Sequence, residues 1–172
     1  MILDLPLTLG RRRKELLKII GSLIILFSAL FIAKSLTREI EDTLKKISAV
    51  RSVLEYTKRQ IGCYALSASE ILRGIDSKTF AECGYKKETP PRDFSEFFSS
   101  VEIGDGEIES ALASFSKDFG KAYRADELAF CALHIERVRA REQKLMKDFA
   151  KRKKVIYTVA LCLALGAVVL LI

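Results

Sequence analysis

The chain has 172 residues, of which 49% are hydrophobic and 30% charged, and its formal net charge is +7. Most of the apolar residues stand in two runs near the ends, and residues 34–154 between them suffice for one compact domain but not for two. The basic residues crowd beside the apolar runs instead of standing among aromatics on a soluble face, so they indicate contact with anionic lipid and argue against nucleic-acid binding.

The first apolar run covers residues 19–33, which is short for a membrane span. It reaches spanning length over residues 16–36, provided that Lys18 and Lys34 extend their ammonium groups to the lipid surface. No small-x-small cleavage site of the usual kind follows, so the run is expected to be retained instead of being removed as a signal peptide. We therefore predict a first membrane anchor at 16–36.

An amphipathic helix is expected to begin at Thr37 and to end at Gly62. Its apolar residues form a narrow stripe of the kind that packs against another long helix. The stripe consists of Leu36, Ile40, Leu44, Ile47, Leu54 and Ile61.

Cap signals then divide the middle of the chain into short helices. Ser67 and Glu70 form a capping-box pattern, and Asp93 and Glu96 repeat it before a segment rich in phenylalanine. Glycines mark the expected helix ends. The short helices are predicted at residues 67–74, 76–84, 93–103 and 107–119.

A last helix is predicted from about Arg124, with no breaker before Gly166. It runs into residues 155–172, which are uncharged and follow four consecutive basic residues: Lys151, Arg152, Lys153 and Lys154. This pattern is typical of a transmembrane helix whose membrane-flanking basic residues stay on the cytoplasmic side. No segment alternates with period two, so no sheet is expected.

These elements predict an all-α, membrane-anchored helical bundle. An antiparallel pair of long helices would carry the short helices as a cap on its far end and would be flanked by two terminal transmembrane helices. The expected organisation is a basic N-terminal extension at 1–15, the first anchor at 16–36, a cytoplasmic helical bundle at 37–154 and the second transmembrane helix at 155–172.

The topology of the first anchor conflicts with this plan. A cytoplasmic bundle would force the basic residues 11–14 across the membrane, against the usual rule. One explanation is that the first run is only half inserted. Another is that residues 1–15 are not translated, with Leu16 or Leu17 as a non-AUG start.

Four carboxylates form a candidate surface for a basic partner: Glu102, Asp105, Glu107 and Glu109. We expect them in the part of the bundle far from the membrane. The alternative is that they belong to an ordinary solvated helix face.

The sequence offers little catalytic chemistry. It has no P-loop, GxSxG, HExxH or GxGxxG motif, and its only histidine is His134. His134 and Cys131 give a C-x-x-H pair, which Cys63 and Cys83 could complete as a zinc site, but Cys131 also belongs to an apolar stripe. We therefore expect no enzyme, metal or cofactor. The alternative is a small membrane-bound sensor or regulator with a helical ligand- or metal-binding domain.

Several stretches resemble the stage III sporulation protein AB family of endospore-forming bacteria. That family is similar to the helical domain of type II secretion inner-membrane platform proteins. The stretches are Leu16–Gly21 at the first anchor, Val53–Glu55, Ile61–Leu72, Phe119–Gly120, Glu127 and Lys151–Ile156. The chain departs from the family pattern at Tyr64, Ser67, Ser69 and Tyr123, and its central region is shorter than is typical.

The resemblance implies a non-enzymatic component of the channel complex between mother cell and forespore. The chain would be a multi-pass protein of the mother-cell-side membrane around the forespore, with its central domain in the cytoplasm. The implied partners are the stage III sporulation protein AA ATPase and other membrane subunits of the complex. Self-association into a homo-oligomer stays open.

Overall fold

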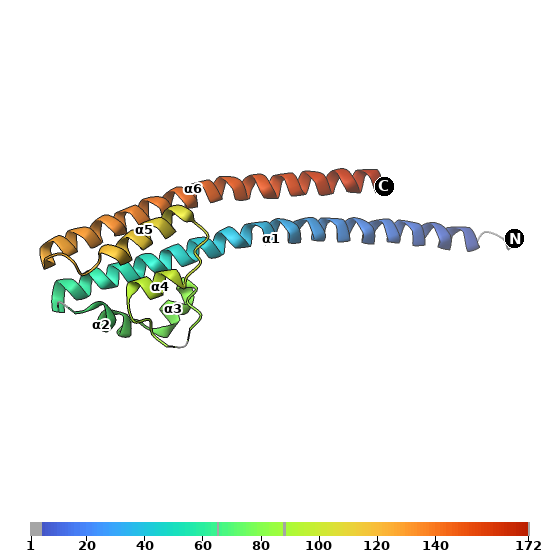
Figure 1. The fold of residues 1–172 in the computed structure, drawn as a ribbon. Coiled ribbons are helices and arrows are strands. Elements are labelled where there is room, and N and C mark those ends of the chain that lie inside the picture. The colour runs from blue at the N-terminus through green and yellow to red at the C-terminus, as the bar shows by residue number, and fades with distance from the viewer. Residues whose placement is uncertain (1–4, 65, 88, 172) are drawn as a thin grey trace. The chain divides into compact units, whose positions relative to one another are not determined.

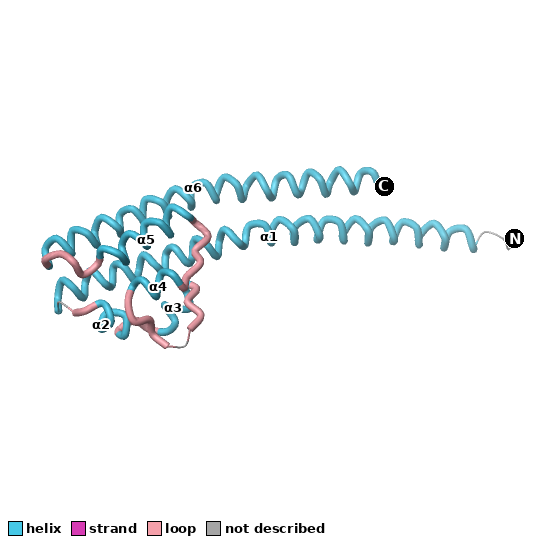
Figure 2. The backbone as a smooth tube through the Cα atoms, viewed as in Figure 1, coloured by secondary structure: helices cyan, strands magenta, loops and turns pink. Residues whose placement is uncertain are grey.

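The computed structural model describes residues 5–64, 66–87 and 89–171, and side chains over 18–64, 66–87 and 89–169. The described chain is all helical, without a strand, which confirms the expected fold class at that level (Figures 1 and 2). The helices are α1 (Leu5–Tyr64), α2 (Ala68–Arg73), α3 (Ser77–Cys83), α4 (Phe94–Ser99), α5 (Gly106–Asp118) and α6 (Arg124–Leu171). Residues 1–4 of the predicted N-terminal extension and residue 172 of the second anchor lie outside the described residues.

Helix α1 is one continuous helix, whereas a separate helix was expected to begin at Thr37. The Thr37 hydroxyl donates to the carbonyl oxygens of Ala33 (3.2 Å) and Lys34 (3.0 Å) in the preceding turn, so Thr37 lies inside the helix instead of capping a new one. The helix also passes Gly62 and ends at Tyr64. Helix α6 is continuous as predicted, and its 48 residues span about 70 Å.

The chain divides into two compact units. The bundle unit is Ile40–Asp148, and the terminal unit combines the chain up to Glu39 with the chain from Phe149. Helices α1 and α6 contribute to both units.

Within the bundle unit, α1 and α6 run antiparallel. Arg51 Nε donates to Glu142 Oε2 at 2.8 Å, and Arg139 Nη2 donates to Glu55 Oε1 at 3.3 Å. Arg124 binds the carbonyl oxygen of Gly62. Residue numbers therefore rise along α1 as they fall along the facing α6.

The core of the bundle unit fills the space between this pair and the short helices. Phe115 of α5 is fully buried. The centre of its ring lies 5.3 Å from the ring centre of Phe94, 5.2 Å from that of Phe119 and 5.5 Å from that of Phe130. Such aromatic contacts add to the stabilisation from burial alone. Buried residues from the two long helices include Ile47, Val50, Leu54, Cys131, Ile135 and Val138.

Local capping explains where the short helices begin. Both hydrogen bonds of the Ser67–Glu70 capping box are present at α2, and the Asp93 side chain accepts from the Glu96 backbone N–H at α4. Gly84 ends α3 with a φ of 92°, a left-handed conformation that favours glycine. The predicted helix at 93–103 already ends at Ser99, because Val101 and Ile103 are buried on an extended segment.

The short helices lie along the flank of the long pair and not on its far end. Lys46 Nζ donates to the Glu102 carbonyl oxygen at 2.6 Å, and Tyr56 Oη donates to the Gly74 carbonyl oxygen at 3.2 Å. Figure 1 shows α5 running beside α6, and Asp105 before α5 binds Arg141. The acidic segment around Asp105 therefore lies near the end of the bundle unit at which α1 enters and α6 leaves, opposite to the expected position.

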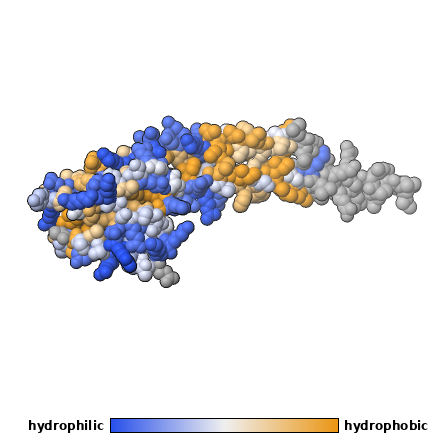
Figure 3. Space-filling model, viewed as in Figure 1, coloured by the Kyte–Doolittle hydropathy of each residue, from blue (hydrophilic) through white to orange (hydrophobic). Residues whose placement is uncertain are grey.

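In the terminal unit, most of the large apolar residues of both helices are exposed. Phe27 is 70% exposed, Phe31 75% and Leu163 70%, and Figure 3 shows the resulting hydrophobic band. Among the described residues, the helix from Lys18 is the one that is long and apolar enough to cross a membrane. The second transmembrane helix and the residue boundaries of the four expected segments stay predictions.

Candidate partner and membrane surfaces

Asp105 holds together the loop before α5 and the neighbouring α6. Its carboxylate accepts from Arg141 Nη2 at 2.8 Å and Nε at 3.1 Å, and it also caps the Ile108 backbone N–H at 3.1 Å. Desolvation is the largest single influence and opposes ionisation. The hydrogen bonds from Arg141 and Ile108 nevertheless hold the pKa of Asp105 below its ordinary value.

The other predicted acidic residues gather around the same loop. Glu107 Oε2 lies 2.8 Å from Arg141 Nη1, and Glu109 Oε1 accepts from the backbone N–H groups of Ile103 and Gly104. Glu102 is exposed, and its carboxylate has no ion-pair partner among the described residues. Three of the four carboxylates, those of Asp105, Glu107 and Glu109, thus bind Arg141 or backbone N–H groups within the bundle unit. Their role as a partner surface stays a prediction.

The predicted membrane-flanking residues are exposed on α6 of the terminal unit. Lys151, Arg152, Lys153 and Lys154 occupy about one turn, immediately before the apolar segment. Lys153 Nζ lies 5.4 Å from the centre of the Phe149 ring. The cluster has the composition of a lipid-headgroup contact, and that role also stays a prediction.

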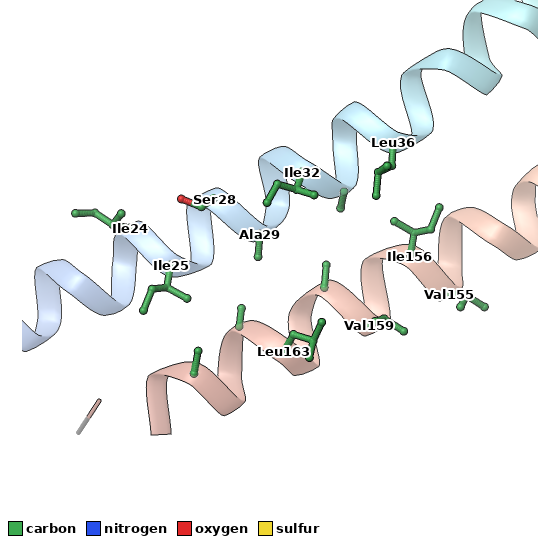
Figure 4. Close-up of a pocket in the computed structure, with 14 residues that line it drawn as sticks. Ile24, Ile25, Ser28, Ala29, Ile32, Leu36, Val155, Ile156, Val159 and Leu163 are labelled. Atoms are coloured by element: carbon green, nitrogen blue, oxygen red, sulfur yellow. The ribbon is translucent and has the colours of Figure 1, made fainter. Parts of the chain in front are cut away.

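The terminal unit contains an apolar groove of about 620 Å³ between its two helices. Figure 4 shows Ile25, Ala29 and Leu36 on the side of α1 toward α6, and Ile156 on the facing side of α6. Ala33 and Ala164 are almost fully buried there. Small residues let helices approach closely in lipid, so this pairing suits a membrane interior.

The candidate C-x-x-H pair is part of the core. The His134 ring lies 4.5 Å from the Phe130 ring and 5.4 Å from the Phe115 ring. Burial raises the pKa of the Cys131 thiol to about 12, and desolvation, together with Arg137, lowers the pKa of His134. Both shifts favour the uncharged side chains.

The four residues considered as a possible zinc site are not brought together. Cys63 is exposed on α1, and Cys83 is buried in α3. In the part of the chain that the structure describes, no group of three or more His, Cys, Asp or Glu side chains could hold a metal ion. A ligand site built on Cys131 and His134 therefore has no support in this geometry.

A second groove lies between α1 and α6 within the bundle unit, and sequence reasoning missed it. It has a volume of about 670 Å³. Two exposed tyrosines stand near its end: Tyr64 closes α1, and Tyr123 precedes α6, whose first residue binds Gly62. The one feature of the sequence that could have indicated this groove is a small residue, Gly62, that closely follows two basic residues, Lys58 and Arg59. The groove is lined by Glu55, Lys58, Arg59, Gly62, Cys63, Leu128, Ala132, Ile135, Glu136 and Arg139.

Comparison with known proteins gives one family. Residues 18–172 match the family described as stage III sporulation protein AB. No curated protein and no solved structure matches the chain. Because the match covers nearly the whole sequence, the chain belongs to the stage III sporulation protein AB family, which implies a role in sporulation.

Proposed function

We propose that this chain is a non-enzymatic membrane scaffold of the channel complex between mother cell and forespore. It would act as a platform-like subunit that docks a cytoplasmic ATPase of the stage III sporulation protein AA type. Family membership supports the link to sporulation. The assignment of scaffold and partner is our proposal.

The observation that carries the proposal is the continuity of α1 and α6. Each helix passes from the bundle unit into the terminal unit without a loop. In the bundle unit the apolar faces of these helices are buried, and in the terminal unit most of their large apolar side chains are exposed. A folded polar domain joined by helix to two apolar segments suits a protein that holds a partner at a membrane.

The basic cluster on α6 supports a cytoplasmic position for the bundle. Lys151, Arg152, Lys153 and Lys154 lie between the bundle unit and the apolar segment. Positive residues beside a membrane span stay on the cytoplasmic side. The bundle would then face the mother-cell cytoplasm, and the protein would cross the mother-cell-side membrane twice.

A pull-down of the tagged full-length protein from sporulating cells, followed by mass spectrometry, tests this function. Recovery of the ATPase together with other small sporulation membrane proteins is expected. A preparation that contains none of them would contradict the scaffold, and one that carries stoichiometric zinc would favour the sensor alternative.

A further inference from the structure

The groove between α1 and α6 of the bundle unit, here the α1/α6 groove, has an apolar floor. Gly62, Leu128 and Ala132 supply small or apolar surface, and Ile135 lies beneath them. A methyl group added at Gly62 would lie 3.8 Å from Leu128 Cδ2. The Leu128 side chain therefore covers the α1 backbone at Gly62, and the floor presents a shallow surface on which a partner helix can lie.

Charge on the walls of the groove is unbalanced. Glu55 and Glu136 are both bound by Arg139, at 3.3 Å and 2.6 Å, and Glu55 also binds Arg51 at 3.0 Å. Lys58 and Arg59 have no carboxylate within ion-pair distance among the described residues. Two carboxylates and three cations line the groove, so its formal net charge is +1. The carboxylates are bound internally, and the ammonium of Lys58 and the guanidinium of Arg59 are the groups available to an external partner.

Exposed aromatic side chains extend this surface at the end of the pair. Tyr64 is 71% exposed and Tyr123 87%. Tyrosine is enriched among the residues that dominate the energy of protein interfaces. At the opposite end of the bundle, Asp105, Glu107 and Glu109 are bound to Arg141 or to backbone N–H groups, and of the four predicted carboxylates Glu102 alone has no such partner among the described residues.

We propose that the α1/α6 groove docks an acidic amphipathic helix of the cytoplasmic partner. The apolar face of that helix would lie over Gly62 and Ala132, and its carboxylates would pair with Lys58 and Arg59. This inference rests on the proposed function, which makes that partner the ATPase. The sequence had indicated an acidic surface for a basic partner, whereas this groove is basic and its partner is acidic.

The test uses full-length protein in detergent and the purified ATPase of the same organism. One variant reverses the groove charges (Lys58→Glu with Arg59→Glu), and a second fills the groove (Ala132→Trp). Capture of the ATPase should fall about tenfold or more in each. Capture by the unmodified protein should also weaken as salt increases.

One matched control should leave capture unchanged. Lys86→Glu with Lys117→Glu makes the same change in net charge at exposed sites outside the groove. Protection of the buried Cys83 and Cys131 thiols from alkylation verifies that every variant is folded.

The outcomes separate the two proposals. If the unmodified protein captures the ATPase and both groove variants still do, the groove assignment is wrong and the scaffold survives. If the unmodified protein captures none, both proposals fail. If the groove variants break a homodimer but leave capture intact, the groove is a contact between copies of this chain, and the docking proposal is wrong.

Discussion

The bundle unit and the terminal unit share helices α1 and α6, yet the large apolar residues of these helices are buried in the first unit and mostly exposed in the second. In the bundle unit, Ile47, Val50 and Leu54 of α1 are fully buried. In the terminal unit, Phe27 and Phe31 of the same helix are 70% and 75% exposed. The helix is therefore the same in both units, and what differs is its surroundings. Protein packs around the apolar side chains of the bundle unit, whereas those of the terminal unit suit an apolar solvent such as lipid.

The largest expected effect contrasts two phenylalanines. Phe115→Ala removes a fully buried ring at the centre of the aromatic cluster and should cost about 3–5 kcal/mol of unfolding free energy. Phe31→Ala removes an exposed ring of the terminal unit and should change bundle stability by less than about 0.5 kcal/mol.

The chain has no tryptophan, so urea unfolding in detergent can be followed by alkylation of the buried Cys83 and Cys131. Burial raises the pKa of both thiols to about 12, which keeps them unreactive until the bundle opens. Equal losses from the two alanine variants would mean that the units do not differ in the way described.

Asp105→Ala should cost about 2–4 kcal/mol, because it leaves Arg141 without its main partner and removes a helix cap. Since the pKa of Asp105 is lowered in the folded protein, its contribution is complete above about pH 4 and is lost as the pH falls through the lowered value. Urea titrations at several pH values, compared with Glu102→Ala at an exposed carboxylate, measure this. Similar losses from both variants would refute the structural role.

Ser67→Ala should cost about 1 kcal/mol, because it removes the capping box of α2 while Ile71 and Leu72 stay buried. Ser52→Ala, at an exposed hydroxyl in the middle of α1, is the control and should be nearly neutral. The comparison asks whether local capping matters where the core already holds a helix. A loss below the experimental error would show that it does not.

The mildest perturbation is moderate acid. Desolvation and Arg137 lower the pKa of His134, so its contribution to stability is complete above about pH 6.5 and is lost as the pH falls toward the lowered value. His134→Phe should abolish this part of the pH dependence and leave the Asp105 part unchanged. Retention of the full pH dependence would assign it to another group.

The sequence predicted local features well, because their causes lie within a few residues. Ser67 with Glu70, Asp93 with Glu96, and Gly84 each determine a helix end through their own backbone contacts. Thr37 was misjudged because the same hydroxyl can begin a helix or bond back into one, and the choice depends on the continuous helix around it.

The surfaces could not be predicted in the same way, because they join residues far apart in the chain. Asp105 and Arg141 are 36 positions apart, so the sequence could not show that this carboxylate is occupied. The α1/α6 groove combines Lys58 and Gly62 with Leu128 and Ala132, and it exists only once the antiparallel pair has formed.

Reactivity of the four cysteines in lipid bilayers tests most directly whether the terminal unit lies in lipid and the bundle unit in water. Cys63 and Cys162 are both exposed in the structure, the first in the bundle unit and the second in the terminal unit, while Cys83 and Cys131 are buried. With a water-soluble, membrane-impermeant maleimide, Cys63 should react in bilayers open to the reagent on both sides. Cys162 should react only once the lipid no longer covers it, whereas the two buried thiols should react only after the protein unfolds. Equal labelling of Cys162 and Cys63 in intact bilayers would contradict the account.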